Sequence, residues 1–97
     1  MYRIIGGRGT GKTYKLLEAA NNTNGIVICS NPLAMREKAR TWGFTDIKDF
    51  IGYKESGYIH QIDHKDVFID EIERYIKEQF TDNHLKGYTY TVEDESI

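Results

Sequence analysis

The positions of apolar residues along the chain predict alternating strands and helices. Short apolar or β-branched runs, typical of strands, occupy residues 2–5, 26–29, 67–69 and 87–92. Apolar residues recur at helical spacing in residues 12–20, 32–42 and 71–80. Strands that alternate with helices form a parallel sheet covered by helices. We therefore expect one α/β domain over residues 1–97, with a short, mostly parallel sheet of roughly three or four strands.

The predicted helices are expected to turn apolar stripes toward this sheet. Asn31 is suited to cap the second helix, Pro32 suits its first turn, and Gly43 stops it. The residues expected to face inward are Leu16, Leu17 and Ala20 in the first helix, Leu33, Met35, Ala39 and Trp42 in the second, and Ile72, Tyr75, Ile76 and Phe80 in the third. Cys29, at the end of a buried strand, is expected to be a packing residue.

Residues 44–65 give a weaker signal. Ile47, Phe50 and Ile51 fit either a short helix or the flank of a strand. A group of metal-binding residue types follows, consisting of His60, Asp63, His64 and Asp66. Nothing in this stretch indicates a helix that would align the two histidines, and no glutamate completes a hydrolytic motif. A polar surface loop is therefore favoured over a metal site.

The composition is typical of a soluble globular domain. Of the 97 residues, 39% are hydrophobic and 29% are charged. A single cysteine excludes an internal disulfide framework and a multi-cysteine metal site. No apolar run is long enough to span a bilayer or to form a signal peptide. We therefore expect an intracellular, cytoplasmic protein with no membrane partner.

The formal net charge of −2 argues against a protein that binds nucleic acid mainly by neutralising phosphates. A local basic face with interleaved aromatic residues could still contact a single strand. Its members would be Lys38, Arg40, Lys48, Lys54, Lys65, Trp42, Tyr53 and Tyr58. Each of these charges is more often a solubilising surface residue.

The strongest chemical signal lies in residues 6–13. The segment Gly6-Gly7-Arg8-Gly9-Thr10-Gly11-Lys12-Thr13 matches the pattern G-x-x-x-x-G-K-[ST] at every position. Glycines let backbone amides turn toward an anion, Lys12 can reach the β- and γ-phosphates, and Thr13 offers a hydroxyl to Mg²⁺. The helix that follows points its positive end at the same place. This segment resembles the Walker A motif of the P-loop NTPases.

Two adjacent carboxylates, Asp70 and Glu71, follow the apolar run 67–69. Acidic residues here could simply cap the next helix. The pair is also similar to the Walker B motif, with its catalytic glutamate, of the additional-strand (ASCE) P-loop ATPases. That resemblance implies that Asp70 holds Mg²⁺ through its water shell and that Glu71 orients or deprotonates the attacking water.

The resemblance implies a small three-layer α/β/α core of a minimal, truncated member, of the kind seen among accessory proteins of phages and mobile elements. In the ASCE division a strand with a polar sensor residue lies between the Walker A and Walker B strands. Residues 87–92 are the remaining candidate for it, with Thr89 or Thr91 as the sensor, although both threonines could be plain strand formers. An arginine finger could come from Arg8 in the loop, or from a neighbouring subunit through Arg36, Arg40 or Arg74.

The resemblance implies an ATP-binding protein, expected to be a Mg²⁺-dependent ATPase in which water attacks the γ-phosphate. ATP is favoured over GTP because the sequence lacks the guanine-reading N-K-x-D motif. An alternative is a nucleotide-gated binding module with little or no hydrolysis, acting on a second copy of the chain, another protein or a nucleic acid. A small nucleoside or nucleotide kinase ranks last, since the sequence Ile69-Asp70-Glu71 resembles thymidine kinases but their zinc-binding cysteines are absent.

Overall fold

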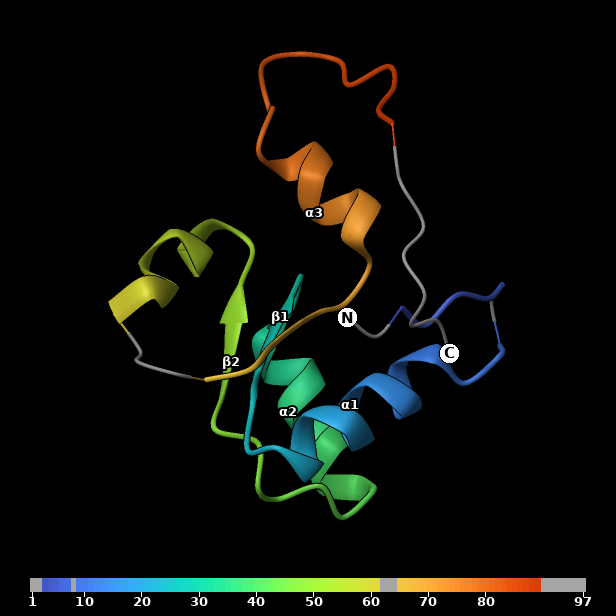
Figure 1. Cartoon of the computed structure of the whole chain (residues 1–97), viewed down its shortest axis with the longest axis vertical. Helices are drawn as coiled ribbons and strands as arrows, with labels where there is room; N and C mark the ends of the chain where they lie inside the picture. Colours follow the sequence, from blue (N-terminus) through green and yellow to red (C-terminus); the bar gives the residue numbers. More distant parts are fainter. Residues whose placement is uncertain (1–2, 8, 62–64, 90–97) are drawn as a thin grey trace.

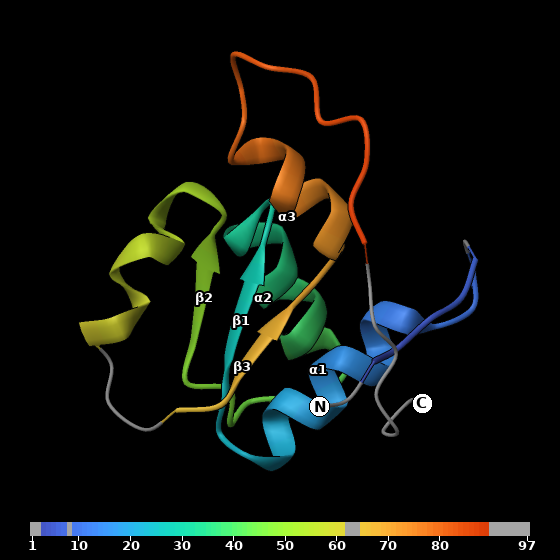
Figure 2. The same ribbon diagram turned by 45° about the horizontal axis from the view of Figure 1, so that its top comes forward.

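Three short parallel strands form the sheet. The computed structural model describes residues 3–7, 9–61 and 65–89. Strand β1 (Ile26–Cys29), labelled with β2 in Figure 1, lies in the middle of the sheet. It pairs in parallel with β2 (Asp49–Gly52) on one side and with β3 (Val67–Ile69) on the other (Figure 2). The prediction of an α/β fold with a parallel sheet is confirmed.

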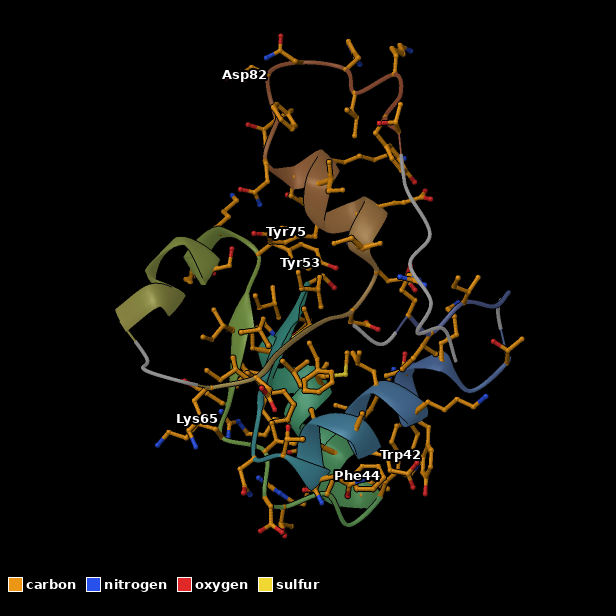
Figure 3. The ribbon with its side chains drawn as sticks, viewed as in Figure 1. Trp42, Phe44, Tyr53, Lys65, Tyr75 and Asp82 are labelled. Carbon is orange, nitrogen blue, oxygen red and sulfur yellow. The ribbon has the colours of Figure 1, made fainter. Side chains whose placement is uncertain are left out.

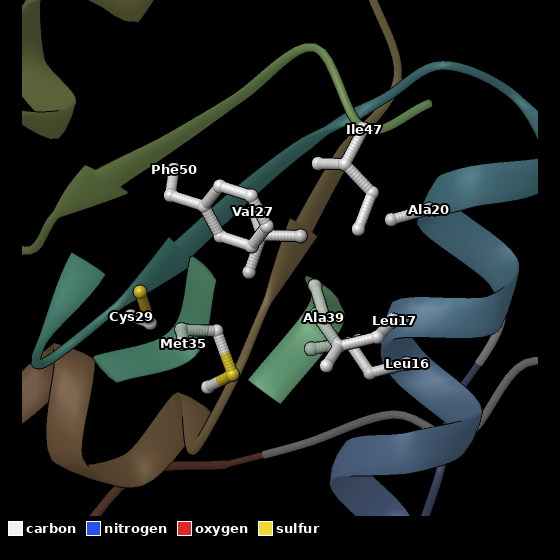
Figure 4. Packing of buried hydrophobic residues seen from close by; sticks show 9 residues of the cluster. All are labelled: Leu16, Leu17, Ala20, Val27, Cys29, Met35, Ala39, Ile47 and Phe50. Carbon is white, nitrogen blue, oxygen red and sulfur yellow. The ribbon is translucent and has the colours of Figure 1, made fainter. Parts of the chain in front are cut away.

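The hydrophobic core lies on one face of the central strand. All four residues of β1 are buried. Because successive side chains of a strand point to opposite faces, Val27 and Cys29 share a face, and Phe50 joins them through its register with Val27. The remaining buried members of this core are Leu16, Leu17, Ala20, Met35, Ala39 and Ile47 (Figure 4). Burial of Cys29 confirms that it packs in the core.

Two helices cover this face, and both begin close to where the sequence predicts. Helix α1 (Lys12–Asn22) contributes Leu17, and α2 (Pro32–Thr41) contributes Met35. The side chain of Asn31 caps α2 by accepting a hydrogen bond from the Ala34 amide at 3.1 Å. Gly43 follows α2 with a φ of +82°, a left-handed conformation that ends helices and suits glycine.

The arrangement of the helices differs from the expected three layers. Helices α1 and α2 pack on the same face of the sheet, since residues of both join Val27 in one cluster. Helix α3 (Ile72–Glu78) follows β3 and lies beyond the carboxyl ends of the strands (Figure 2). In the part of the chain that the structure describes, the sheet therefore has helices packed on one face and a third helix at its end.

The stretch that the sequence left open forms β2 and a 3-10 helix. Phe50 and Ile51 lie in β2, and η1 (Lys54–Gln61) follows it along the outer edge of the sheet (Figure 2). A strand is therefore correct for residues 49–52. The sequence predicted a loop at His60, but the backbone of His60 belongs to the 3-10 helix η1, so this prediction is wrong there.

Gly25 allows the strands to come together at their amino ends. A Cβ atom on Gly25 would lie 2.9 Å from the Asp66 carbonyl oxygen and 3.0 Å from the Phe68 ring. The carbonyl of Gly25 accepts the Lys48 amide at 2.8 Å, and the Ile26 amide donates to Asp66 at 2.8 Å. The backbone around Gly25 thus joins both neighbouring strands to β1.

The two terminal strands expected from the sequence are not formed in the described residues. Arg3 makes a single isolated bridge, and residues 4–7 have no strand conformation, although Ile4 packs against the core. Residues 87–89 are also irregular, and residues 90–92 lie outside the described part. An apolar or β-branched run alone does not form a strand, because a strand also needs a neighbour to pair with.

Several residues expected inside lie at the surface. Leu33 and Met35 are two positions apart, which places them about 200° apart around a helix, so both cannot face the same core. Met35 is buried and Leu33 is 78% exposed. The other large residues found exposed despite an inward or buried prediction are Trp42, Val67, Ile72 and Phe80. Tyr75 and Ile76 of α3 are half-buried, so the predicted stripe of that helix is confirmed only in its middle.

None of the helices in residues 3–7, 9–61 and 65–89 has the length and apolar character needed to cross a membrane.

Leucine substitutions test this assignment of the core. Leu17→Ala is expected to lower the free energy of unfolding by about 2–5 kcal/mol, because Leu17 is fully buried. Leu33→Ala makes the same chemical change at an exposed helical position and is expected to shift it by less than about 0.5 kcal/mol. Urea unfolding measures both values. Comparable losses in the two variants would show that Leu33 belongs to the core.

Candidate functional site

The glycine-rich segment before α1 folds back on itself. Gly9 and Gly11 have φ values of +73° and +77°, which only glycine adopts readily. The Thr10 hydroxyl donates to the Gly7 carbonyl at 2.7 Å. Gly6 faces the same threonine so closely that a Cβ atom would lie 2.6 Å from its hydroxyl oxygen. In Figure 2 this segment, drawn in dark blue, extends away from the sheet at the start of α1.

The amino end of α1 is suited to an anion. Gly11 is the N-cap residue and has no side chain with which to cap the first amides. No acidic residue lies in the first turn, so the positive end of the helix dipole is not neutralised there. Lys12 is the first helical residue, and its Nζ donates to the Gly7 carbonyl at 3.2 Å. The same Nζ lies 4.0 Å from Oε1 of Glu71.

Asp70 is positioned by the sheet. Its amide donates to the Ile28 carbonyl at 2.9 Å, which extends the pairing of β3 with β1 by one residue. Its half-buried carboxylate lies near the side chain of Thr13. Burial, and then the negative charge of Glu71, raise the pKa of Asp70, while Lys38, Lys12 and the Thr13 side chain oppose this rise. The Asp70 carboxylate, whose pKa depends on these neighbouring charges, therefore lies beside the loop.

Glu71 has a strained backbone. Its φ of 57° and ψ of 68° are left-handed, a conformation that is uncommon for residues other than glycine. Its carbonyl accepts the Tyr75 amide at 3.0 Å, so Glu71 begins α3. Strained residues of this kind persist only where surrounding contacts hold them, and they are concentrated at functional sites.

These groups border one open cleft of about 820 Å³. Its volume lies within the range of small-molecule sites. The lining residues are Gly6, Gly7, Gly9, Thr10, Gly11, Lys12, Thr13, Glu71 and Arg74. The structure therefore brings the predicted loop residues and Glu71 to one place, with Asp70 reaching the same place through Thr13. Arg8 lies outside the described residues.

The arginines differ from the sequence interpretation. Arg74 was one of three candidates for a finger from a neighbouring subunit, and in this structure it lines the cleft of its own chain. Arg36 pairs with Asp49 at 3.3 Å and lies over the Phe50 ring at 5.0 Å. Arg40 pairs with Glu37 at 3.2 Å. Arg74 is thus the described arginine that borders the cleft, and its position one turn into α3 could not be placed from the sequence.

Tyr53 was also missed as a residue of this site. It follows β2 directly, and its hydroxyl donates to the carbonyl oxygen of Asp70 at 2.8 Å. No local pattern indicates this contact, because residues 44–65 had no predicted structure that would place Tyr53 near Asp70.

The remaining sequence candidates do not assemble in the described residues. Asp63 and His64 lie outside the described part, and no group of three metal-binding side chains occurs within it. Thr89 is not on a strand, and Thr91 lies outside the described part. No sensor residue can therefore be assigned to the cleft.

The residues of the alternative basic aromatic face do not gather on one surface in the described part of the chain. Tyr53 is buried, and the side chain of Tyr58 is not among those described. Trp42 packs edge-on against Tyr14 at 5.2 Å between ring centroids. Trp42 and Lys65 lie on opposite sides of the molecule in Figure 3.

Replacing Asp70 with asparagine is expected to stabilise the chain at neutral pH. The folded-state pKa of Asp70 is raised above 3.8. The Asp70 carboxyl therefore binds its proton more tightly in the folded chain than in the unfolded chain. Stability therefore falls as pH rises from the unfolded to the folded pKa, and the deficit persists at higher pH.

Thermal unfolding of Asp70→Asn should give a Tm above that of the wild type at neutral pH. The difference should shrink to zero as the pH falls below 3.8, the ordinary pKa of the group. Asp66→Asn, at an exposed position, is the control and should show no comparable gain. A lower Tm for Asp70→Asn at neutral pH would contradict the burial effect.

No protein-family model, curated protein or solved structure matches this chain. The function proposed below is therefore inferred from the sequence motifs and from the contacts of the cleft.

Proposed function

We propose that the chain binds ATP with Mg²⁺ in the cleft before α1 and hydrolyses it as an ATPase. The observation that carries this proposal is the meeting of Lys12 and Thr13 with Asp70 and Glu71. These four residues come from two distant segments, and they meet where Thr13 lies near Asp70 and where Lys12 approaches Glu71 to 4.0 Å. Chance similarity to a loop motif would not bring the second segment to the first.

The loop supports binding of the phosphate chain. Amides of residues 9–12 and the uncapped first turn of α1 are donors suited to phosphate oxygens. Lys12 adds a full positive charge that is only loosely held, because its contacts are one carbonyl and one carboxylate 4.0 Å away. In this proposal Lys12 leaves the Gly7 carbonyl and binds the β- and γ-phosphates.

The donor atoms at Thr13 and Asp70 fit Mg²⁺. Mg²⁺ prefers oxygen ligands and keeps several of its waters. The Thr13 hydroxyl and the Asp70 carboxylate are adjacent oxygen groups, and Asp70 is half-buried beside the cleft. Thr13 would contact the ion directly and Asp70 through a water. When bound, the ion neutralises charge on the phosphate oxygens.

Glu71 and Arg74 supply the remaining chemistry of the proposed reaction. Glu71 lines the cleft with an exposed carboxylate and is placed to orient the attacking water and accept its proton. Arg74 lines the same cleft from α3 and can offset negative charge that develops on the phosphoryl group.

A nucleotide-gated binding module is the second candidate. It is favoured by α3, which has no fully buried residue although it carries Arg74 and begins at Glu71. A helix held by few buried contacts moves at little cost. Nucleotide contacts to Glu71 and Arg74 would then change the position of α3, and a partner could read this change without any hydrolysis.

Lys12→Ala is expected to weaken ATP binding by about 10- to 100-fold, because one charge-assisted contact to phosphate is lost. Isothermal titration calorimetry with Mg²⁺ and ATP measures the change. Lys15→Ala is the matched control, since Lys15 is an exposed lysine one turn into α1. Unchanged affinity in Lys12→Ala would refute nucleotide binding at this loop.

Glu71→Gln is expected to retain ATP binding and to lower phosphate release by about 100-fold or more, because the group that accepts the water proton is lost. Glu78→Gln, at the other end of α3, is the control. Wild-type binding without release would instead identify the nucleotide-gated module, and conversion of ATP to ADP only with an added phosphate acceptor, without phosphate release, would identify a kinase.

A further inference from the structure

A small, largely buried network joins the residue that follows β2 with η1 and α3. Tyr53 is 5% exposed and Ser56 is 6% exposed. The Ser56 hydroxyl donates to the Tyr53 carbonyl at 2.8 Å and lies 3.0 Å from the Tyr75 hydroxyl. The rings of Tyr53 and Tyr75 meet edge-on, with 5.5 Å between centroids (Figure 3). Tyr53 is thus connected with one residue of η1 and one residue of α3.

This network ends on the peptide that links the two carboxylates. The Tyr53 hydroxyl donates to the Asp70 carbonyl oxygen, which belongs to the peptide plane between Asp70 and Glu71. The orientation of that plane is set by ψ of Asp70 and φ of Glu71. These same angles fix where the two side chains leave the backbone. One hydrogen bond therefore acts on both carboxylates at once.

Glu71 needs such a restraint. Its φ of 57° costs energy, and this conformation persists only where surrounding contacts offset the cost. On the carboxyl side, the Tyr75 amide donates to the Glu71 carbonyl at 3.0 Å. On the amino side, the Tyr53 hydroxyl holds the preceding peptide oxygen. Tyr75 takes part in both restraints, because its ring and hydroxyl also contact Tyr53 and Ser56.

We propose that Tyr53 is a positioning residue that fixes the Asp70–Glu71 peptide, and with it the Mg²⁺-nucleotide geometry of the cleft, while Ser56 and Tyr75 hold Tyr53 in place. The inference rests on the proposed function for its nucleotide readout. The restraint on the peptide itself is independent of any ligand.

Tyr53→Phe tests this role with the smallest change. It keeps the ring against Tyr75 and removes the donor to Asp70. The affinity for ATP with Mg²⁺ is expected to fall about three- to ten-fold, the effect of one neutral hydrogen bond. The affinity for ATP in EDTA should stay within about two-fold of the wild type, because the loop is untouched. Calorimetry in the two buffers gives both values.

Tyr14→Phe is the matched control. Tyr14 also packs edge-on against aromatic rings, and no hydrogen bond of its hydroxyl is found in the described part of the chain. It should keep the wild-type response to Mg²⁺. A merely structural role for Tyr53 would lower Tm and both affinities together. Equal losses with and without Mg²⁺ would therefore overturn the positioning role.

Backbone amide exchange provides a readout without nucleotide. In Tyr53→Phe the amides of residues 71–75 are expected to exchange about three- to ten-fold faster, while those of α1 and α2 keep their rates. Ser56→Ala should give a smaller change in the same residues. Unchanged exchange at 71–75 would overturn the inference even if ATP binds. Failure of the wild type to bind ATP, with faster exchange in Tyr53→Phe, would refute the proposed function and leave the restraint supported.

Discussion

The pairing of β3 with β1 determines where the acidic pair of the candidate site lies. Ile69 lies beside Ile28, and the next amide, that of Asp70, continues the ladder to the Ile28 carbonyl. A slip of one residue would turn the Asp70 side chain to the other face of the sheet, away from Thr13. Gly25 permits the close approach of the strands in this register, because a larger residue there would meet Asp66 and Phe68. The acidic pair thus depends on a glycine far from the cleft.

The site is maintained against local energetic costs. Asp70 is half-buried with a raised pKa, and Glu71 is held in a left-handed conformation. The core of a small domain is modest and can offset such costs only in part. Here the core is centred on Val27 and the two helices that cover it. Buried contacts behind the turn, through Tyr53, place part of this support directly at the strained peptide.

The sequence predicted the elements whose local signals agree with their packing. Helices α1 and α2 and strand β1 have clear periodicity, and the capping role of Asn31 was correct. Strand β2 was left open because Asp49 and Gly52 are types depleted in strands. Pairing with β1 overrides that preference, and the Asp49 carboxylate finds partners in the Phe50 amide and Arg36. The contact of Tyr53 with Asp70 joins residues 17 positions apart and left no trace in the local pattern.

The Gly7 carbonyl accepts a hydrogen bond from Lys12 and so competes with any anion for that lysine. It accepts hydrogen bonds from both Thr10 and Lys12, so the loop is already partly satisfied by its own backbone. In the proposed function, an incoming anion would displace the Lys12 contact before it gains from that lysine, and its apparent affinity would be reduced by that exchange. An isolated phosphate would gain little from the exchange, whereas a polyphosphate would reach the helix amides and the lysine together. The loop would thereby select for the length of an anion as well as for its charge.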